Sequence, residues 1–100
     1  MSLQSIEQQI NQLKSLMAFS AQFKSELQSK ISVYDNKVRG LYDSGIPVEF
    51  RNSFEMSCHQ PTKKALSSMI DAIEQRDIPF LKQQIQSLEM ALQIAKKNKF

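Results

Sequence analysis

The fold is decided by a stretch near the middle of the chain, Leu41-Tyr42-Asp43-Ser44-Gly45-Ile46-Pro47-Val48. Gly45 accepts a left-handed backbone that a side chain disfavours, and Asp43 and Ser44 can form hydrogen bonds to nearby backbone groups. Pro47 suits the first turn of a following helix. Long helical patterns run on both sides without a comparable break. We therefore predict one domain, a hairpin with arm 1 over about residues 2–41, a turn over 42–47 and arm 2 over about 48–97.

The composition fits long helices with a narrow apolar seam. The chain has 100 residues, 41% of them hydrophobic, with two glycines, three prolines and no tryptophan. Its formal net charge is +3, and the only basic cluster is Lys96, Lys97 and Lys99, where positive charge complements the end of a helix dipole. Nucleic-acid binding calls for a concentrated basic stripe, so we place it behind protein binding.

The cysteine content and the hydropathy of the chain indicate in which cellular compartment it is made. Cys58 is the only cysteine, so no intramolecular disulfide can form, and we expect it to be a small buried hydrophobe. The N-terminal residues lack a basic start followed by an apolar run, so we expect synthesis in the cytoplasm without a general signal peptide. No segment approaches the roughly 18 uninterrupted apolar residues of a membrane span.

Arm 1 carries apolar residues at two positions of a seven-residue repeat. One row is Leu3, Ile10, Met17, Lys24, Ile31 and Val38, and the other is Ile6, Leu13, Ser20, Leu27, Tyr34 and Leu41. This pattern predicts a helix whose seam packs against arm 2. Ser20 and Lys24 interrupt the seam, and there Leu16, Phe19 and Phe23 supply apolar surface on a neighbouring face. That surface is either a drift of the core stripe around the helix or an aromatic contact for another chain.

Arm 2 contains two proline interruptions. Phe50 and Phe54 are expected to close the hairpin against Leu41 and Tyr42. Pro61 predicts a kink or brief break. At Pro79 the helix either bends or ends, and in the second case Asp77 is a candidate N-cap of a new helix. The seven-residue repeat then resumes with Ile78, Ile85 and Leu92 in one row and Leu81, Leu88 and Ala95 in the other. Matching repeats are what two antiparallel arms need to pair.

No motif indicates catalysis. The chain has no Gly-rich phosphate loop, paired-Cys motif, His-Glu-x-x-His or nucleophile elbow, and its single His would have to serve nearly every acid and base role. His59 adjoins Cys58, but two adjacent potential ligands rarely face one metal ion. We predict no enzyme, no cofactor, no metal site and no small-molecule substrate.

The layout and the central turn resemble the early-secreted-antigen family of type VII secretion. These are helical hairpins of about 100 residues with Trp-x-Gly at the turn, and here Tyr42-Asp-Ser-Gly45 takes that place, with Tyr for Trp and one residue inserted. Pro47 and the aromatic start of arm 2 follow it. Neither Tyr34 nor Tyr42 is followed by an acidic residue four positions later, so the family's Tyr-x-x-x-Asp/Glu export signal is absent. The resemblance implies a secreted or secretion-associated partner or adaptor, either the partner that lacks the signal or one of the small helical proteins that accompany larger type VII effectors.

Geometry adds a prediction of association. Two antiparallel helices hide one stripe each, yet Leu16, Phe19, Phe23, Phe80 and Met90 lie outside the seam. We predict that Leu16, Phe19, Phe23 and Phe80 bind a protein partner in a four-helix-bundle-like homodimer or heterodimer. The alternative function is a cytoplasmic helical chaperone or assembly subunit unrelated to type VII export.

Overall fold

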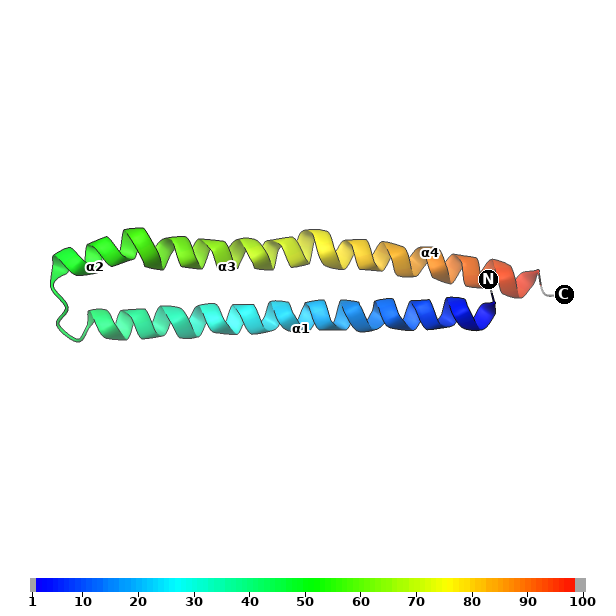
Figure 1. Cartoon of the computed structure of the whole chain (residues 1–100), viewed down its shortest axis with the longest axis horizontal. Helices are drawn as coiled ribbons and strands as arrows, with labels where there is room; N and C mark the ends of the chain where they lie inside the picture. The colour runs from blue at the N-terminus through cyan, green and yellow to red at the C-terminus, as the bar shows by residue number, and fades with distance from the viewer. Residues whose placement is uncertain (1, 99–100) are drawn as a thin grey trace.

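A computed structural model describes residues 2–98, which form two antiparallel helical arms joined by one turn (Figure 1). The first arm is a single helix, α1 (Leu3–Tyr42). The second arm is a continuous helical rod of three α-helices, α2 (Val48–Phe54), α3 (Gln60–Ala72) and α4 (Ile78–Lys97). Two π-helical turns join them: η1 (Glu55–His59) between α2 and α3, and η2 (Ile73–Asp77) between α3 and α4. The molecule measures 77 × 16 × 13 Å. Residues 2–98 contain no strand, and the predicted all-α hairpin is confirmed.

The turn is built largely as its residues predict. Gly45 has a φ of 96°, the left-handed conformation expected of it, and the Ser44 hydroxyl donates a 2.6 Å hydrogen bond to the carbonyl of Leu41. Pro47, with a φ of −55° and a ψ of 141°, is the N-cap of α2 rather than part of its first turn. The tight reversal brings Tyr42 at the end of α1 next to the start of the second arm.

Both prolines of the second arm are accommodated without a break. A helical proline has no N–H to donate, and its ring clashes with the carbonyl four residues earlier. The helix widens before each one, so that the N–H of Gln60 bonds to the carbonyl of Glu55 and the N–H of Ile78 to that of Ile73. Each π turn adds one residue to the helix. The sequence predicted a second arm that is kinked or broken near Pro61 and Pro79. Of these alternatives the break is not observed, because widened turns keep the backbone bonded.

Asp77 is not the N-cap of a new helix, as its position before Pro79 had suggested. Its backbone is in the right-handed helical region, and its side chain makes no capping hydrogen bond. Instead its carboxylate accepts a 2.8 Å hydrogen bond from Arg76 Nε. The extra residue of η2 also has a packing consequence, because it returns Ile78 to the seam five positions after Ile73 instead of turning it into solvent.

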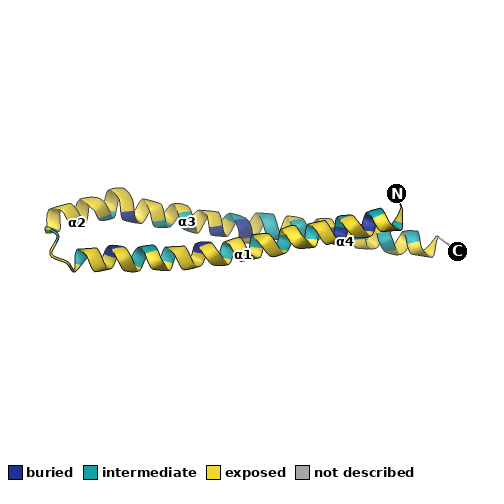
Figure 2. Cartoon of the chain, turned by 60° about the horizontal axis from the view of Figure 1, so that its bottom comes forward, coloured by how far each residue is buried: buried dark blue, intermediate teal, exposed yellow. Residues whose placement is uncertain are grey.

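The seam contains two apolar clusters (Figure 2). The cluster toward the termini has Ile6, Ile10 and Ile85 buried, with Leu13, Met17, Leu88 and Leu92 packed against them. The middle cluster has Leu27, Ile70 and Ile73 buried, with Ile31, Leu66 and Ile78 packed against them. Between the clusters the half-buried Ser20 and Lys24 occupy the seam, and the Lys24 ammonium lies 3.9 Å from the Glu74 carboxylate.

Two single-residue expectations were wrong. Leu41 is 58% exposed, because the stripe of a straight helix drifts from a strict seven-residue repeat and Tyr42 takes the inward position. Cys58 is exposed, because η1 turns its neighbour His59 inward. His59 is 3% exposed.

Candidate functional site

An apolar patch lies outside the seam, near the middle of the hairpin. It consists of Leu16, Phe19 and Phe23 on α1 and Phe80 on α4, whose exposed fractions are 53%, 65%, 37% and 57%. The rings of Phe19 and Phe23 stack, with centroids 6.2 Å apart and planes within 2°. All four residues that the sequence proposed for partner binding therefore present apolar surface to solvent.

The antiparallel register brings Phe80 beside the α1 part of the patch. Lys24 contacts Glu74 across the seam, and Phe80 follows Glu74 by six residues. Because the arms run in opposite directions, Phe80 lies level with residue 18 and so at the height of Phe19 along the hairpin. Phe19 follows the seam residue Met17 by two positions, and Phe80 follows the seam residue Ile78 by two positions, so both occupy the same position of the seven-residue repeat. In two antiparallel helices, residues at the same repeat position lie on the same broad face of the pair. We call this broad face the patch face.

The opposite broad face has a different character. Its flanking positions carry Glu7 and Lys14 on α1 and Lys82 and Glu89 on α4, all exposed. A fifth apolar residue, Met90, is 63% exposed but occupies the outward side of α4, away from the patch. Leu16, Phe19, Phe23 and Phe80 are thus gathered on one side of a hairpin whose other side is charged.

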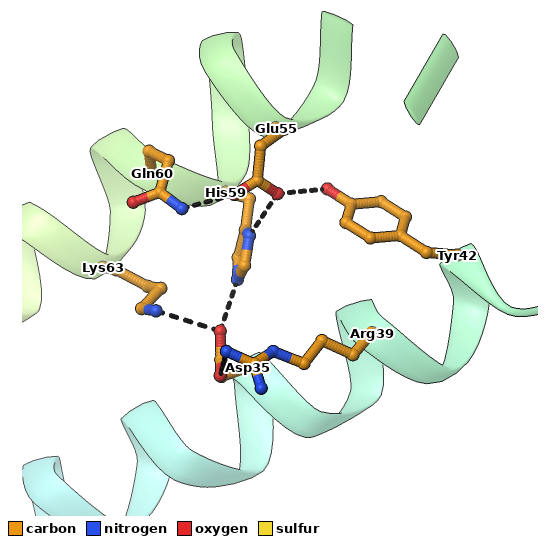
Figure 3. Close-up of polar contacts among 7 residues, drawn as sticks. All are labelled: Asp35, Arg39, Tyr42, Glu55, His59, Gln60 and Lys63. Carbon is orange, nitrogen blue, oxygen red and sulfur yellow. Dashed lines mark hydrogen bonds and ion pairs between the residues drawn. The ribbon is translucent and has the colours of Figure 1, made fainter. Parts of the chain in front are cut away.

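A second site of organised side chains lies at the closed end, between α1 and η1 (Figure 3). His59 Nδ1 is 2.6 Å from Glu55 Oε2, and its Nε2 is 3.0 Å from Asp35 Oδ1. The second contact is a close approach of the two atoms rather than an aligned hydrogen bond. The imidazole also meets the rings of Tyr34 and Tyr42 edge-on, with centroids 5.4 and 6.2 Å away.

Cations and hydrogen-bond donors surround the two carboxylates. Lys63 Nζ is 3.0 Å from Asp35 Oδ1, and Arg39 lies 3.2 Å from the other oxygen of the same carboxylate. The Tyr42 hydroxyl donates a 2.6 Å hydrogen bond to Glu55, which also accepts one from the side-chain amide of Gln60. We call Asp35, Arg39, Tyr42, Glu55, His59, Gln60 and Lys63 the closed-end polar cluster.

These contacts shift three pKa values. The hydrogen bond from Tyr42, followed by those from Gln60 and His59, lowers the pKa of Glu55 to about 2. Burial and the hydrogen bond to Glu55 raise the pKa of Tyr42 to about 12. The pKa of Asp35 is lowered chiefly by its hydrogen bond from Lys63. The cluster therefore favours charged carboxylates and a neutral phenol.

The closed-end polar cluster has the geometry of a clasp between the arms. Both nitrogens of His59 lie against carboxylates and the ring is almost fully buried. The cluster also lines an open cavity of about 420 Å³ between the arms. Residues 2–98 contain no group of three or more His, Cys, Asp or Glu side chains arranged to hold a metal ion. Cys58 and His59, adjacent in sequence, point to different environments.

Only part of this cluster has a signal in the sequence. Asp35–Arg39 and Glu55–His59 are pairs four residues apart, the spacing at which helical side chains meet. Their convergence depends on the register of the two arms, which the repeats specify only to within a turn. The cluster was therefore missed.

A small apolar pocket of about 350 Å³ lies at the tip of the hairpin. It is lined by Val38, Leu41, Tyr42, Ile46, Phe50, Arg51 and Phe54. The expected closure of the tip by Phe50 and Phe54 is incomplete, because these rings are 68% and 40% exposed and line the pocket without filling it. Tyr42, Gly45 and Pro47, the predicted turn motif, all lie at this end.

Comparison with known proteins provides no relative from which to transfer a function: no family model, no curated protein and no solved structure matches the chain. Among the helices of residues 2–98, none is long and apolar enough to cross a membrane. The exposed apolar patch and the closed-end polar cluster are accordingly interpreted from their own geometry.

Proposed function

We propose that this chain is a non-enzymatic helical protein-protein interaction module, which binds another helical protein through Leu16, Phe19, Phe23 and Phe80. The observation that carries the proposal is the concentration of these exposed side chains at one level of one broad face. Large apolar side chains in contact with one another on a surface mark interaction sites, and aromatic residues dominate the binding energy of such sites.

The seam supports the same proposal. Ser20 and Lys24 occupy the interior at the level where Phe19, Phe23 and Phe80 are outside. A two-helix hairpin has no third layer to cover these rings. A partner helix pair would cover them and convert the hairpin into a four-helix bundle, in which each helix buries a wider stripe.

As the biological setting we propose a small partner or adaptor of a type VII-like export system. The Tyr42 to Gly45 turn between two long arms supports this assignment. In such a system the chain would be exported with its partner. Deletion of the export ATPase in the producing cell should then retain the chain inside the cell, and secretion unaffected by this deletion would contradict the assignment.

Site-specific photo-crosslinking in the producing cell tests the interaction itself. A photoreactive phenylalanine analogue at Phe19 should give one defined protein adduct, whereas the same analogue at Gln8, exposed on the outward side of α1, should not. Mass spectrometry of the adduct then identifies the partner. Equal labelling from both positions, or none from either, would refute the proposed interaction surface.

A further inference from the structure

We propose that the closed-end polar cluster is a proton-dependent clasp. The two arms are held together near the turn by a His59 ring that carries a proton on both nitrogens, and the closed end loosens when the ring loses one of them. Such a clasp goes beyond partner binding and acts on the half of the hairpin nearer the turn. Three features support it: the carboxylates on both sides of the ring, the charges around them and the small apolar content of the closed end.

Both nitrogens of the His59 ring face a carboxylate oxygen (Figure 3). Nδ1 is 2.6 Å from Oε2 of Glu55 on the same arm, and Nε2 is 3.0 Å from Oδ1 of Asp35 on α1. A neutral imidazole has one N–H, and its other nitrogen presents a lone pair. In either neutral tautomer a lone pair would therefore lie against an oxygen that also carries lone pairs. The imidazolium has an N–H at both nitrogens, so each close approach becomes an attraction between opposite charges.

The carboxylates around the ring favour the second proton. Hydrogen bonds to its carboxylate lower the pKa of Glu55 to about 2, and the pKa of Asp35 is also lowered, chiefly by the hydrogen bond from Lys63. Both groups are therefore ionised near neutral pH. The opposing cations Lys63 and Arg39 lie against the Asp35 carboxylate. Among residues 2–98 no lysine or arginine forms an ion pair with Glu55, so the charge of Glu55 is balanced by His59.

The other titratable or charged groups near the ring do not change this balance. Tyr34 and Tyr42 meet it edge-on, and phenols are neutral at the pH at which an imidazole titrates. Arg51 of α2 and Asp43 at the end of α1 line the open cavity beside the cluster and carry opposite charges. The two carboxylates in contact with the nitrogens therefore decide how many protons the ring carries.

The closed end has little apolar contact that could hold it shut without this ring. The two apolar clusters lie toward the termini and in the middle of the hairpin, and between residues 32 and 65 only Val38 and His59 are buried. Lys63 and Tyr42 make the other polar contacts between the arms at this end. Loss of the second proton therefore loosens the closed end, while the two apolar clusters keep the rest of the hairpin paired.

The sign of the pH dependence follows from proton binding. The closed state of the clasp holds one more proton than the loosened state at a pH where a free imidazole is neutral, so a rise in pH favours loosening. The contribution of His59 is thus complete at mildly acidic pH and is lost as the closed ring titrates. Loss of a hydrogen bond to a charged group should shift the opening equilibrium on the order of 10-fold or more.

The single histidine allows its protonation to be measured directly. Because the chain contains one His, the imidazole nitrogen signals in a ¹⁵N NMR spectrum of the untagged, labelled protein all belong to His59. At about pH 7.5 a free imidazole is about nine-tenths neutral, and we expect His59 to show two protonated nitrogens at this pH. A ring with one protonated nitrogen at this pH would overturn the proposal.

Amide hydrogen exchange along a pH series measures the loosening itself. After correction for the intrinsic pH dependence of exchange, the protection of residues 50–60 should fall on the order of 10-fold or more as the ring titrates. Protection around Ile70 and Ile85, in the two apolar clusters, should stay constant. Tyrosine fluorescence provides a second readout of this end alone, because the chain has no Trp and both of its Tyr side chains contact the His59 ring. Both transitions should coincide with the imidazole titration, and unchanged protection throughout it would overturn the proposal.

Two variants separate the proton-dependent clasp from a purely structural role of the ring. His59→Gln retains a polar side chain that does not titrate, so the fall in protection with pH should disappear. Asp35→Asn removes the negative charge that faces Nε2, so the ring should lose its second proton at a pH lower by about one unit or more. Lys24→Gln, at the polar pair with Glu74, is the matched control and should keep the wild-type profile. A transition that persists in His59→Gln, or a wild-type imidazole titration in Asp35→Asn, would overturn the proposal.

Discussion

Replacing Leu27 by Ala tests how much of the hairpin's stability depends on the seam. Leu27 is 6% exposed and packs with Ile70 and Ile73. Loss of a buried leucine side chain costs about 2–5 kcal/mol, and the cost rises with the cavity that remains. A slab two helices thick can collapse or admit water at the vacated site, so we expect the lower part of this range, about 2–3 kcal/mol.

The half-buried Leu13 and Leu88 should lose less, about 1–2 kcal/mol each, because part of their surface already meets water. The free energy of unfolding can be measured by urea titration followed by circular dichroism. In a chain of this length 1 kcal/mol corresponds to about 4–8 °C in Tm, so Leu27→Ala should lower Tm by about 10–20 °C. Gln8→Ala and Gln86→Ala, both at exposed positions, should change the free energy by less than about 0.5 kcal/mol. Equal effects at Leu27 and Gln86 would refute the assigned register.

The remaining predictions concern the closed end and the turn. The pKa of Glu55 falls from 4.5 to about 2 on folding, so its contribution to stability is complete above pH 4.5 and is lost as pH falls toward 2; Glu55→Gln should flatten this acid limb in pH-dependent unfolding. The pKa of Tyr42 rises from 10.0 to about 12 on folding, so its contribution to stability is complete below pH 10 and is lost as pH rises toward 12. Tyr42→Phe should therefore flatten the alkaline limb of pH-dependent unfolding. An unchanged acid limb in Glu55→Gln, or an unchanged alkaline limb in Tyr42→Phe, would contradict the assigned hydrogen bond. Gly45→Ala should destabilise the protein by about 1 kcal/mol, because Gly45 has a left-handed backbone that alanine disfavours. Gly40→Ala should stabilise it by a similar amount, because alanine has the higher helix propensity within α1. Both sites have open space for a methyl group, so a steric clash does not contribute to either effect. Urea titration of the two alanine variants should give opposite signs, and the same sign in both would refute the turn conformation.

The overall fold was predictable because its determinants are local. The turn residues around Gly45 and the seven-residue repeat of α1 each specify a structure within a short window of sequence. The exposure of Phe19 and Phe23 was predictable for a related reason, since a residue that departs from a repeat leaves the seam. The same repeat placed Phe80 outside the seam of α4.

The π turns were not predictable in this way. A proline inside a helical pattern has the same local signature whether the helix ends, kinks or widens by one residue. The outcome is decided by tertiary packing: with η2 widened, Ile73 and Ile78 both reach the seam, and with η1 widened, His59 rather than Cys58 turns inward. Burial of a single side chain therefore depended on a backbone choice that neighbouring residues do not encode.

The polar contacts between the arms help to select the register in which the two helices pair. An apolar seam with a seven-residue repeat tolerates a slip of one arm by a whole repeat, because leucine and isoleucine would again meet leucine and isoleucine. Such a slip would separate Lys24 from Glu74 and would remove His59 and Lys63 from Asp35, so the contacts between the arms would be lost while Arg39 stayed beside Asp35. The Lys24–Glu74 pair and the closed-end polar cluster thus favour one register of the two arms. Because that register also sets Phe80 at the level of Phe19, the polar contacts between the arms influence where the α4 residue of the apolar patch lies relative to its α1 residues.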